Sequence, residues 1–240
     1  MATSSAVEVG RLGERVDNLV FDLDGTLIDS VPGIGSSLAE AFLSIGRTMP
    51  AADLRRSIGP PIGVISRRLE PSLSEDEVVS IEKAYRTSYD TNGWRQTVPF
   101  SGVAETLQVL HRSRYRLFVV TNKPRIPSEK ILLQLGLLSL FQSICTRDTR
   151  TPPFSSKAEM LNDVMQQHKL YPASTVMIGD TSEDGEAAEA NGIRFIYASY
   201  GYGSPTHAHL TIHDFSNLRS ALLPNFPDSE LHVKGDTVSA

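Results

Sequence analysis

The chain has 240 residues, of which 40% are hydrophobic, so its length and composition allow one large domain with a sizeable core. A formal net charge of -5 argues against general nucleic-acid binding, which needs a strongly basic face. The single cysteine, Cys145, excludes an internal disulfide and any cysteine-based metal cluster. Because we find no secretory leader and no apolar run of membrane-spanning length, we expect a cytoplasmic protein without membrane contact.

The first predicted element is a buried strand that ends in a pair of acids. Residues 19–21 are apolar, and Asp22 and Asp24 follow directly, before the break at Gly25. Residues two apart in an extended segment point to the same face, so both carboxylates can converge at the carboxyl end of the strand. Open α/β sheets bind their ligands there. Paired carboxylates resist joint ionisation, and a hard cation that prefers oxygen ligands, such as Mg²⁺, relieves this repulsion.

The stretch from Val31 to Gln96 has the pattern of helices alone. Apolar residues recur at helical spacing over 31–45, 62–69 and 75–89, and a Gly/Pro-built loop interrupts these helices near residues 57–62. No strand-like run occurs within these limits. We therefore predict an all-helical segment.

From Val98 onward, helices alternate with short apolar strands. The predicted strands are 117–120, 141–145, 175–178 and 194–198, and the predicted helices are 104–111, 128–135, 157–170 and 183–191. Such alternation implies right-handed crossovers and a parallel sheet. The first strand belongs with this series, so the predicted fold is α/β. Residues 1–30 and 97–240 form a Rossmann-like parallel-sheet core, and the helical segment 31–96 is an insertion into it.

Two further polar clusters follow predicted strands. Thr121 and Asn122 offer short donors suited to phosphate oxygens, although turn chemistry explains them as well. Asp180 and Asp184 are one turn apart at a predicted helix start, where the helix dipole by itself favours an acid. Because the carboxyl ends of parallel strands share one edge, these clusters can meet the first pair of acids. The combination favours ligands over helix caps.

Several basic residues are candidates for substrate or phosphate contacts. Lys157 opens a predicted helix, where a cation opposes the dipole, and this unusual position favours it over Lys123 as the lysine that neutralises phosphate. Paired arginines in the helical segment are typical of a solvated face. Arg56, close to the Gly59-Pro60-Pro61 loop, is nevertheless the candidate for gripping the far end of a substrate. The three histidines within residues 207–213 are predicted to lie in a surface loop rather than at a metal site.

Four motifs together resemble a known family. In chain order they are Phe21-Asp22-Leu23-Asp24-Gly25-Thr26-Leu27, Thr121-Asn122, Lys157 and Gly179-Asp180-Thr181-Ser182-Glu183-Asp184. Their types and order resemble the haloacid dehalogenase-like superfamily over residues 18–204. The loop at 58–61 and the stretch 201–203 make the phosphoglycolate phosphatase-like branch the most similar one. The helical insert resembles the small helical cap of that family, and on this basis we expect residues 31–96 to be a cap domain.

The resemblance implies a Mg²⁺-dependent phosphatase that works through an aspartyl-phosphate intermediate. Asp22 would be the nucleophile, and Asp24 the general acid toward the leaving alcohol and then the base for water. Thr121 and Asn122 would bind the transferring phosphoryl group, and Lys157 would steady its charge. One departure is the stretch 151–156, since many relatives carry a Lys-Pro pair before the lysine.

The same resemblance implies the metal ligands. Asp22, the backbone carbonyl of Asp24, and Asp180 would hold Mg²⁺, and Asp184 would act through a bound water. Asp24 also indicates phosphate chemistry, because the dehalogenases of the superfamily lack the second aspartate.

The expected partner is a small phosphate ester, such as phosphoglycolate, a sugar phosphate or a nucleotide, and we expect a monomer or homodimer. A phosphomutase of the same superfamily and a non-catalytic binding or regulatory relative remain the alternatives.

Overall fold

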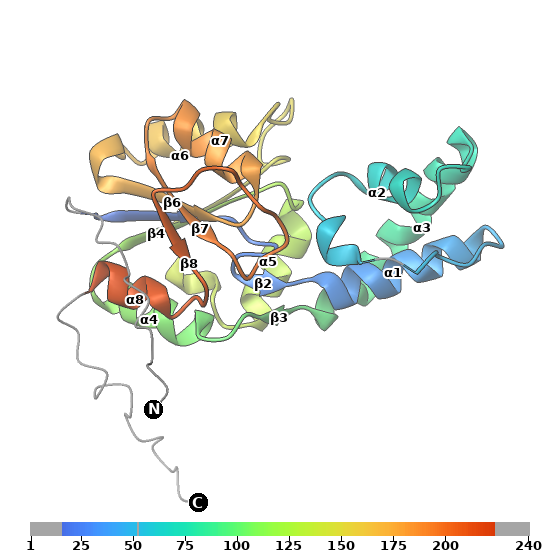
Figure 1. The fold of residues 1–240 in the computed structure, drawn as a ribbon, viewed down its shortest axis with the longest axis horizontal. Coiled ribbons are helices and arrows are strands. Elements are labelled where there is room, and N and C mark those ends of the chain that lie inside the picture. Colours follow the sequence, from blue (N-terminus) through green and yellow to red (C-terminus); the bar gives the residue numbers. More distant parts are fainter. Residues whose placement is uncertain (1–15, 52, 224–240) are drawn as a thin grey trace, which may run out of the picture.

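A six-stranded parallel sheet runs through the protein, and a group of helices lies beyond one end of it (Figure 1). The computed structural model describes residues 16–51 and 53–223. The strands follow the order β5-β4-β1-β6-β7-β8, with every neighbouring pair parallel. Their bounds are β1 Asn18–Phe21, β4 Arg116–Thr121, β5 Ser143–Thr146, β6 Thr175–Gly179, β7 Arg194–Ala198 and β8 Leu210–Ile212. The predicted α/β fold with a parallel sheet is confirmed.

Helices cover both faces of the sheet, which explains why its central strands are apolar throughout. Leu19 and Phe21 of β1 pack into the core cluster on one face, whereas Val20 packs into the cluster on the other. A strand buried on both faces needs a continuous apolar run. One face carries α4 (Val103–Arg112), α5 (Arg125–Gln134) and α8 (Asn217–Leu222), and the opposite face carries α6 (Lys157–Gln167) and α7 (Ser182–Ala190).

The register of the three central strands places the polar residues at one edge. Phe21 lies level with Val119 of β4 and with Ile178 of β6. The backbone N–H of Asp22 continues this pairing by donating to the carbonyl of Ile178 at 2.9 Å. Asp22 and Asp180 therefore leave the sheet at the same edge, at the carboxyl ends of neighbouring strands.

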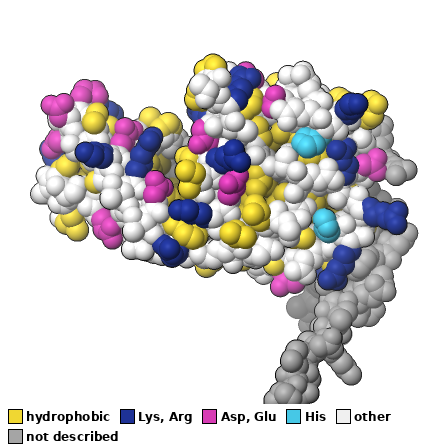
Figure 2. Space-filling model, turned by 180° about the vertical axis from the view of Figure 1, so that it is seen from behind, with side chains coloured by type: hydrophobic (Ala, Val, Ile, Leu, Met, Phe, Trp, Pro, Cys, Tyr) yellow, Lys and Arg dark blue, Asp and Glu magenta, His cyan; other side chains and the backbone are white. Residues whose placement is uncertain are grey.

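The helical region, residues 31–96, has a core of its own. It contains α1 (Val31–Ser44), η1 (Leu54–Arg56), α2 (Ile62–Leu69), α3 (Glu75–Thr91) and η2 (Gly93–Gln96), with no strand among its described residues. Leu38 and Phe42 of α1 pack against Ile81 of α3 in a cluster separate from those of the sheet. Seen from behind, this region forms one end of the molecule, and charged side chains of both signs are spread over it (Figure 2).

Two short linkers join the helical region to the sheet. They are β2 (Ile28–Asp29) and β3 (Val98–Pro99), which pair with each other in antiparallel fashion. A separate core and a paired connection support the proposal that residues 31–96 form a cap domain. The predicted core domain includes residues 1–15 and 224–240, which lie outside the described residues.

Two strands of the six-stranded sheet differ from the sequence prediction, which also lacks the linker strands β2 and β3. The predicted strand 141–145 begins later, at Ser143, because Leu138–Leu140 form a 3₁₀ turn. The sequence pattern predicts a surface loop over residues 207–213, whereas the structure forms β8 within it. This strand has only three residues, and only Ile212 is fully buried, so its apolar pattern is weak.

No helix within the described residues is long and apolar enough to cross a membrane.

Candidate active site

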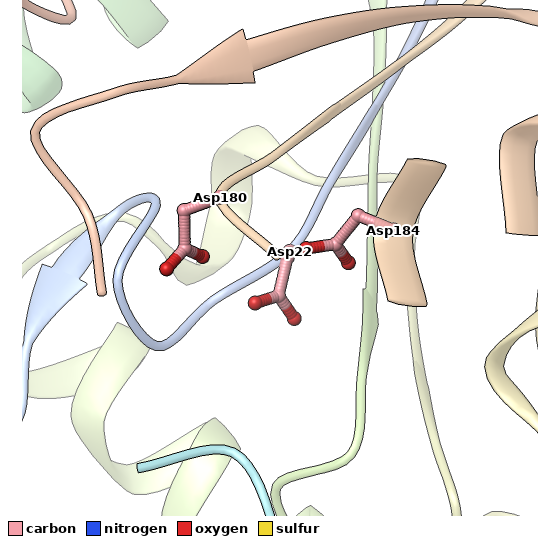
Figure 3. A group of neighbouring side chains, drawn as sticks. All are labelled: Asp22, Asp180 and Asp184. Carbon is pink, nitrogen blue, oxygen red and sulfur yellow. The ribbon is translucent and has the colours of Figure 1, made fainter. Parts of the chain in front are cut away.

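Three buried carboxylates converge beside the end of β1 (Figure 3). Asp22 follows β1, Asp180 follows β6, and Asp184 lies in the first turn of α7. One ligand oxygen of each lies within 4.8 Å of the other two. The sheet thus brings together three of the acids that the sequence pattern singled out.

Asp180 is held from two sides. The Thr26 hydroxyl donates to its Oδ1 at 2.9 Å, and the backbone N–H of Tyr202 donates to its Oδ2 at 2.7 Å. Burial, together with the charge of Asp184, raises the pKa of Asp180 to about 6, although these two hydrogen bonds oppose the rise. The carboxyl is therefore placed firmly but in an environment that disfavours its charge.

Two glycines make room for this carboxyl. A Cβ on Gly201 would lie 2.3 Å from the Cβ of Asp180, and a Cβ on Gly25 would lie 2.3 Å from its Oδ2. Gly25 also has a φ of +87°, which favours glycine. The two loops that carry Gly25 and Gly201 can approach Asp180 this closely only because glycine has no side chain at these two positions.

Lys157 links the other two acids of the group. Its Nζ donates to Oδ1 of Asp22 at 2.9 Å and to Oδ1 of Asp184 at 2.6 Å. Burial raises the pKa of Asp22 well above its usual range, and the ammonium of Lys157 only partly opposes this. The second oxygen of Asp184 accepts from the backbone N–H and the hydroxyl of Thr181, at 2.9 and 2.7 Å. Lys157 therefore fixes the orientation of the predicted nucleophile.

The side chain of Asp24 is engaged by a different lysine. The Nζ of Lys123 donates to both carboxylate oxygens of Asp24, at 3.0 and 3.2 Å. It also lies 4.9 Å from the ring centroid of Tyr89, which belongs to α3 of the helical region. Burial lowers the pKa of Lys123, but Asp24, Tyr89 and Tyr85 together outweigh this effect, so the pKa is raised. Coordination of a metal by the Asp24 backbone carbonyl stays a prediction.

Two further predicted site residues, Thr121 and Asn122, make hydrogen bonds next to the site. Thr121 is buried at the end of β4, and its hydroxyl accepts from the backbone N–H of Lys123 at 3.2 Å. The Asn122 amide donates to Oε2 of Glu183 at 2.7 Å, so α7 holds it. The side chain of Arg56 lies outside the described part of the structure. Contacts of these three predicted residues with a substrate remain predictions.

The cluster of three carboxylates fits a hard divalent cation. Asp22, Asp180 and Asp184 offer only oxygen ligands, and within the described residues they form the one group of three or more potential metal ligands. Buried carboxylates this close repel each other, and a cation among them offsets the repulsion. Mg²⁺ prefers oxygen ligands of this kind.

Comparison with known proteins agrees with this geometry. The family described as haloacid dehalogenase-like hydrolase matches residues 19–198. The chain belongs to this family. It is 35% identical to the tyrosine-protein kinase PtkA of Mycobacterium tuberculosis over 192 residues, which are 80% of this chain and 65% of PtkA, so it spans less than two thirds of that relative.

Two further relatives agree with the assignment to the haloacid dehalogenase-like hydrolases. The phosphoglycolate phosphatase of Pseudomonas putida is 32% identical over 225 residues, which cover 88% of this chain and 79% of the relative. A haloacid dehalogenase-like hydrolase from Streptococcus pneumoniae superimposes with a TM-score of 0.76 at 26% identity, covering 85% of this chain and 97% of that one. The resemblance inferred from the four motifs is confirmed.

The sequence pattern assigns no role to three residues that shape this hydrolase site. Thr26 binds Asp180, Glu183 binds Asn122, and Tyr202 binds Asp180 through its backbone. Thr26 and Glu183 stand inside the recognised motifs, so their position pointed to the site. Tyr202 contacts the site through its N–H, and residue type carries no information about such a contact.

Proposed function

We propose that this haloacid dehalogenase-like hydrolase is a Mg²⁺-dependent phosphatase that hydrolyses a small phosphomonoester. The observation that carries the proposal is the buried pair of Asp22 and Lys157, joined at 2.9 Å beside the carboxylates of Asp180 and Asp184. Phosphoryl transfer needs positioning and charge neutralisation above all, and this group supplies both.

In the proposed first step, Asp22 attacks phosphorus. Lys157 binds Oδ1 of Asp22, and Oδ2 is the attacking oxygen. The ester P–O bond breaks as the new bond forms, so the phosphoryl group passes to Asp22 as an aspartyl phosphate. Asp22, the backbone carbonyl of Asp24, and Asp180 would hold Mg²⁺, with Asp184 acting through a bound water, and the metal would neutralise charge on the phosphoryl oxygens.

Asp24 acts as the general acid in the first step and as the general base in the second. It donates a proton to the leaving alcohol and then removes one from the water that attacks the aspartyl phosphate. In the structure Lys123 binds both oxygens of Asp24. As general acid, Asp24 must carry a proton, so this ion pair opens and Asp24 takes up a proton from solvent as the substrate enters.

A Mg²⁺-supplemented phosphate-release screen tests the proposal. The substrates are phosphoglycolate, sugar phosphates, nucleotides and pyrophosphate. The similarity to the Pseudomonas putida enzyme makes phosphoglycolate-like esters the first candidates. We expect release that stops in excess chelator, returns with Mg²⁺ and is absent in Asp22→Asn. Release that persists in the chelator or in Asp22→Asn would show that the mechanism is wrong.

A second candidate function differs in both the phosphoryl donor and the phosphoryl acceptor. The 35% identity to the tyrosine-protein kinase PtkA supports, as this second candidate, transfer of the terminal phosphoryl group of ATP to a tyrosine hydroxyl, with ADP leaving. Incubation with ATP and a tyrosine-containing polypeptide, followed by phosphotyrosine detection, tests this transfer. With a sugar monophosphate, isomer formation without phosphate release would instead indicate a phosphomutase. Phosphate that accumulates in proportion to the ester consumed supports the phosphatase.

A further inference from the structure

The two linkers of the helical region meet at one aromatic side chain. Tyr202 lies in the loop after β7, and its hydroxyl accepts from the backbone N–H of Ser30 at 2.9 Å. The same hydroxyl donates to Oδ1 of Asp29, the last residue of β2, at 2.9 Å. The ring of Phe100, which follows β3, lies 6.4 Å from the Tyr202 ring. Tyr202 therefore contacts both connections between the sheet and the helical region.

The helical region reaches back to the same point. Arg55, in η1, forms an ion pair with Oδ2 of Asp29. Its guanidinium also lies 5.7 Å from the centroid of the Tyr202 ring. Oδ1 of Asp29 thus accepts from Tyr202 of the sheet domain and from the backbone N–H of Val31 at 3.2 Å, whereas Oδ2 is bound by Arg55. Movement of the helical region away from the sheet would break the Arg55 contacts.

The opposite end of Tyr202 holds a carboxylate of the active site. Its backbone N–H donates to Asp180 at 2.7 Å. The flanking glycines leave no free space: a Cβ on Gly201 would lie 2.3 Å from the Cβ of Asp180, and one on Gly203 would lie 2.5 Å from its carbonyl oxygen. Since atoms packed this closely move together, a displaced Tyr202 displaces Asp180 as well.

We propose that Tyr202 is a positioning residue that couples closure of the helical region to the placement of Asp180. With the region closed, Arg55 and Asp29 hold the Tyr202 side chain, and its backbone then holds the carboxyl where Mg²⁺ binds. With the region open, this support is lost. The inference rests on the proposed Mg²⁺ site, and by reciprocity Mg²⁺ binding favours closure by the same factor by which closure favours Mg²⁺ binding.

Hydrogen exchange at the Phe100 amide, with and without Mg²⁺, tests the coupling. This N–H bridges the linkers by donating to the Leu27 carbonyl at 3.1 Å, so it exchanges when they separate. In the unaltered protein, saturating Mg²⁺ should slow its exchange at least threefold. In Tyr202→Phe, which loses the Asp29 contact but keeps the backbone N–H to Asp180, Mg²⁺ should still bind but leave the exchange rate unchanged.

Arg55→Gln gives a second test that leaves the Tyr202 ring in place. Its ion pair is partly exposed, so its loss should speed Phe100 exchange and weaken Mg²⁺ binding, both by about two- to fivefold. Calorimetric titration with Mg²⁺ in the absence of substrate measures the binding. The matched control is Arg47→Gln, whose partner Glu77 lies within the helical region, and neither quantity should change.

The results separate the two proposals. If Mg²⁺ binds but Tyr202→Phe shows the same slowing as the unaltered protein, the coupling is overturned and the phosphatase proposal stands. If Arg55→Gln speeds exchange but leaves Mg²⁺ affinity unchanged, the coupling is likewise overturned. If the unaltered protein binds no Mg²⁺, the metal site and the coupling both fail.

Discussion

Replacing Lys157 by Met removes the cation between two buried acids and should strongly destabilise the metal-free protein. Lys157 binds Asp22 at 2.9 Å and Asp184 at 2.6 Å, and all three side chains are at most 6% exposed. Removing one partner of a buried ion pair costs about 3–5 kcal/mol, because the remaining charge is left without compensation. Met fills a similar volume, so a cavity adds little to this effect. The expected loss is a large fraction of a typical total stability of roughly 5–15 kcal/mol.

Urea unfolding followed by circular dichroism measures this loss. We expect Lys157→Met to lower the free energy of unfolding by about 3–5 kcal/mol at pH 7.5 in chelator, and by less with Mg²⁺ present, since the metal replaces the missing positive charge. The control is Lys130→Met, which removes an exposed lysine beside Trp94 and should change the stability by less than about 1 kcal/mol. A loss below about 1 kcal/mol for Lys157→Met in chelator would refute the charge-balance reasoning.

Three further predictions concern Asp22, Asp180 and Gly201. Asp22→Asn should abolish phosphate release in the colorimetric assay with the circular dichroism spectrum unchanged; retained release would exclude Asp22 as nucleophile. The raised pKa of Asp180, about 6, means that the protonated folded state is favoured. The protonated Asp180 carboxyl contributes fully to the free energy of unfolding below pH ~4. This contribution, about 3 kcal/mol, is lost as pH rises through ~6. Because Mg²⁺ offsets this loss, the increase in melting temperature that Mg²⁺ causes should be larger at pH 7.5 than at pH 5, and an equal increase would contradict the pKa. Gly201→Ala places a Cβ 2.3 Å from the Cβ of Asp180 and should weaken Mg²⁺ binding at least tenfold in calorimetric titration, whereas unchanged affinity would show that the loop adapts.

The sheet could be predicted because its strands are buried on both faces. Such strands are continuous apolar runs, and β1, β6 and β7 have this pattern almost throughout. In contrast, β8 has three residues, one of them exposed, so local pattern could not separate it from a loop. The linkers β2 and β3 have two residues each, too few for any periodicity.

The acids of the site and Lys157 could be predicted, but the partners of Asp24 and Asp180 could not. Asp22 and Asp180 follow apolar strands, and parallel strands end at one edge. The partner of Asp24 is Lys123, which is covered by the ring of Tyr89. Because Tyr89 lies in a helix about thirty residues earlier in the chain, local sequence patterns do not reveal this contact. Tyr202 acts through its backbone N–H and through contacts with both linkers, and a one-dimensional pattern records neither of these.

The most direct test of the central proposal is chemical trapping of the aspartyl phosphate. The protein is quenched during turnover with the best substrate of the phosphate-release screen, and borohydride then reduces any acyl phosphate to an alcohol. Peptide mass spectrometry locates the reduced residue. We expect homoserine at position 22, dependent on substrate and Mg²⁺. Turnover with no reduced residue, or with the modification at Asp24 instead, would contradict the assignment of Asp22 as the nucleophile.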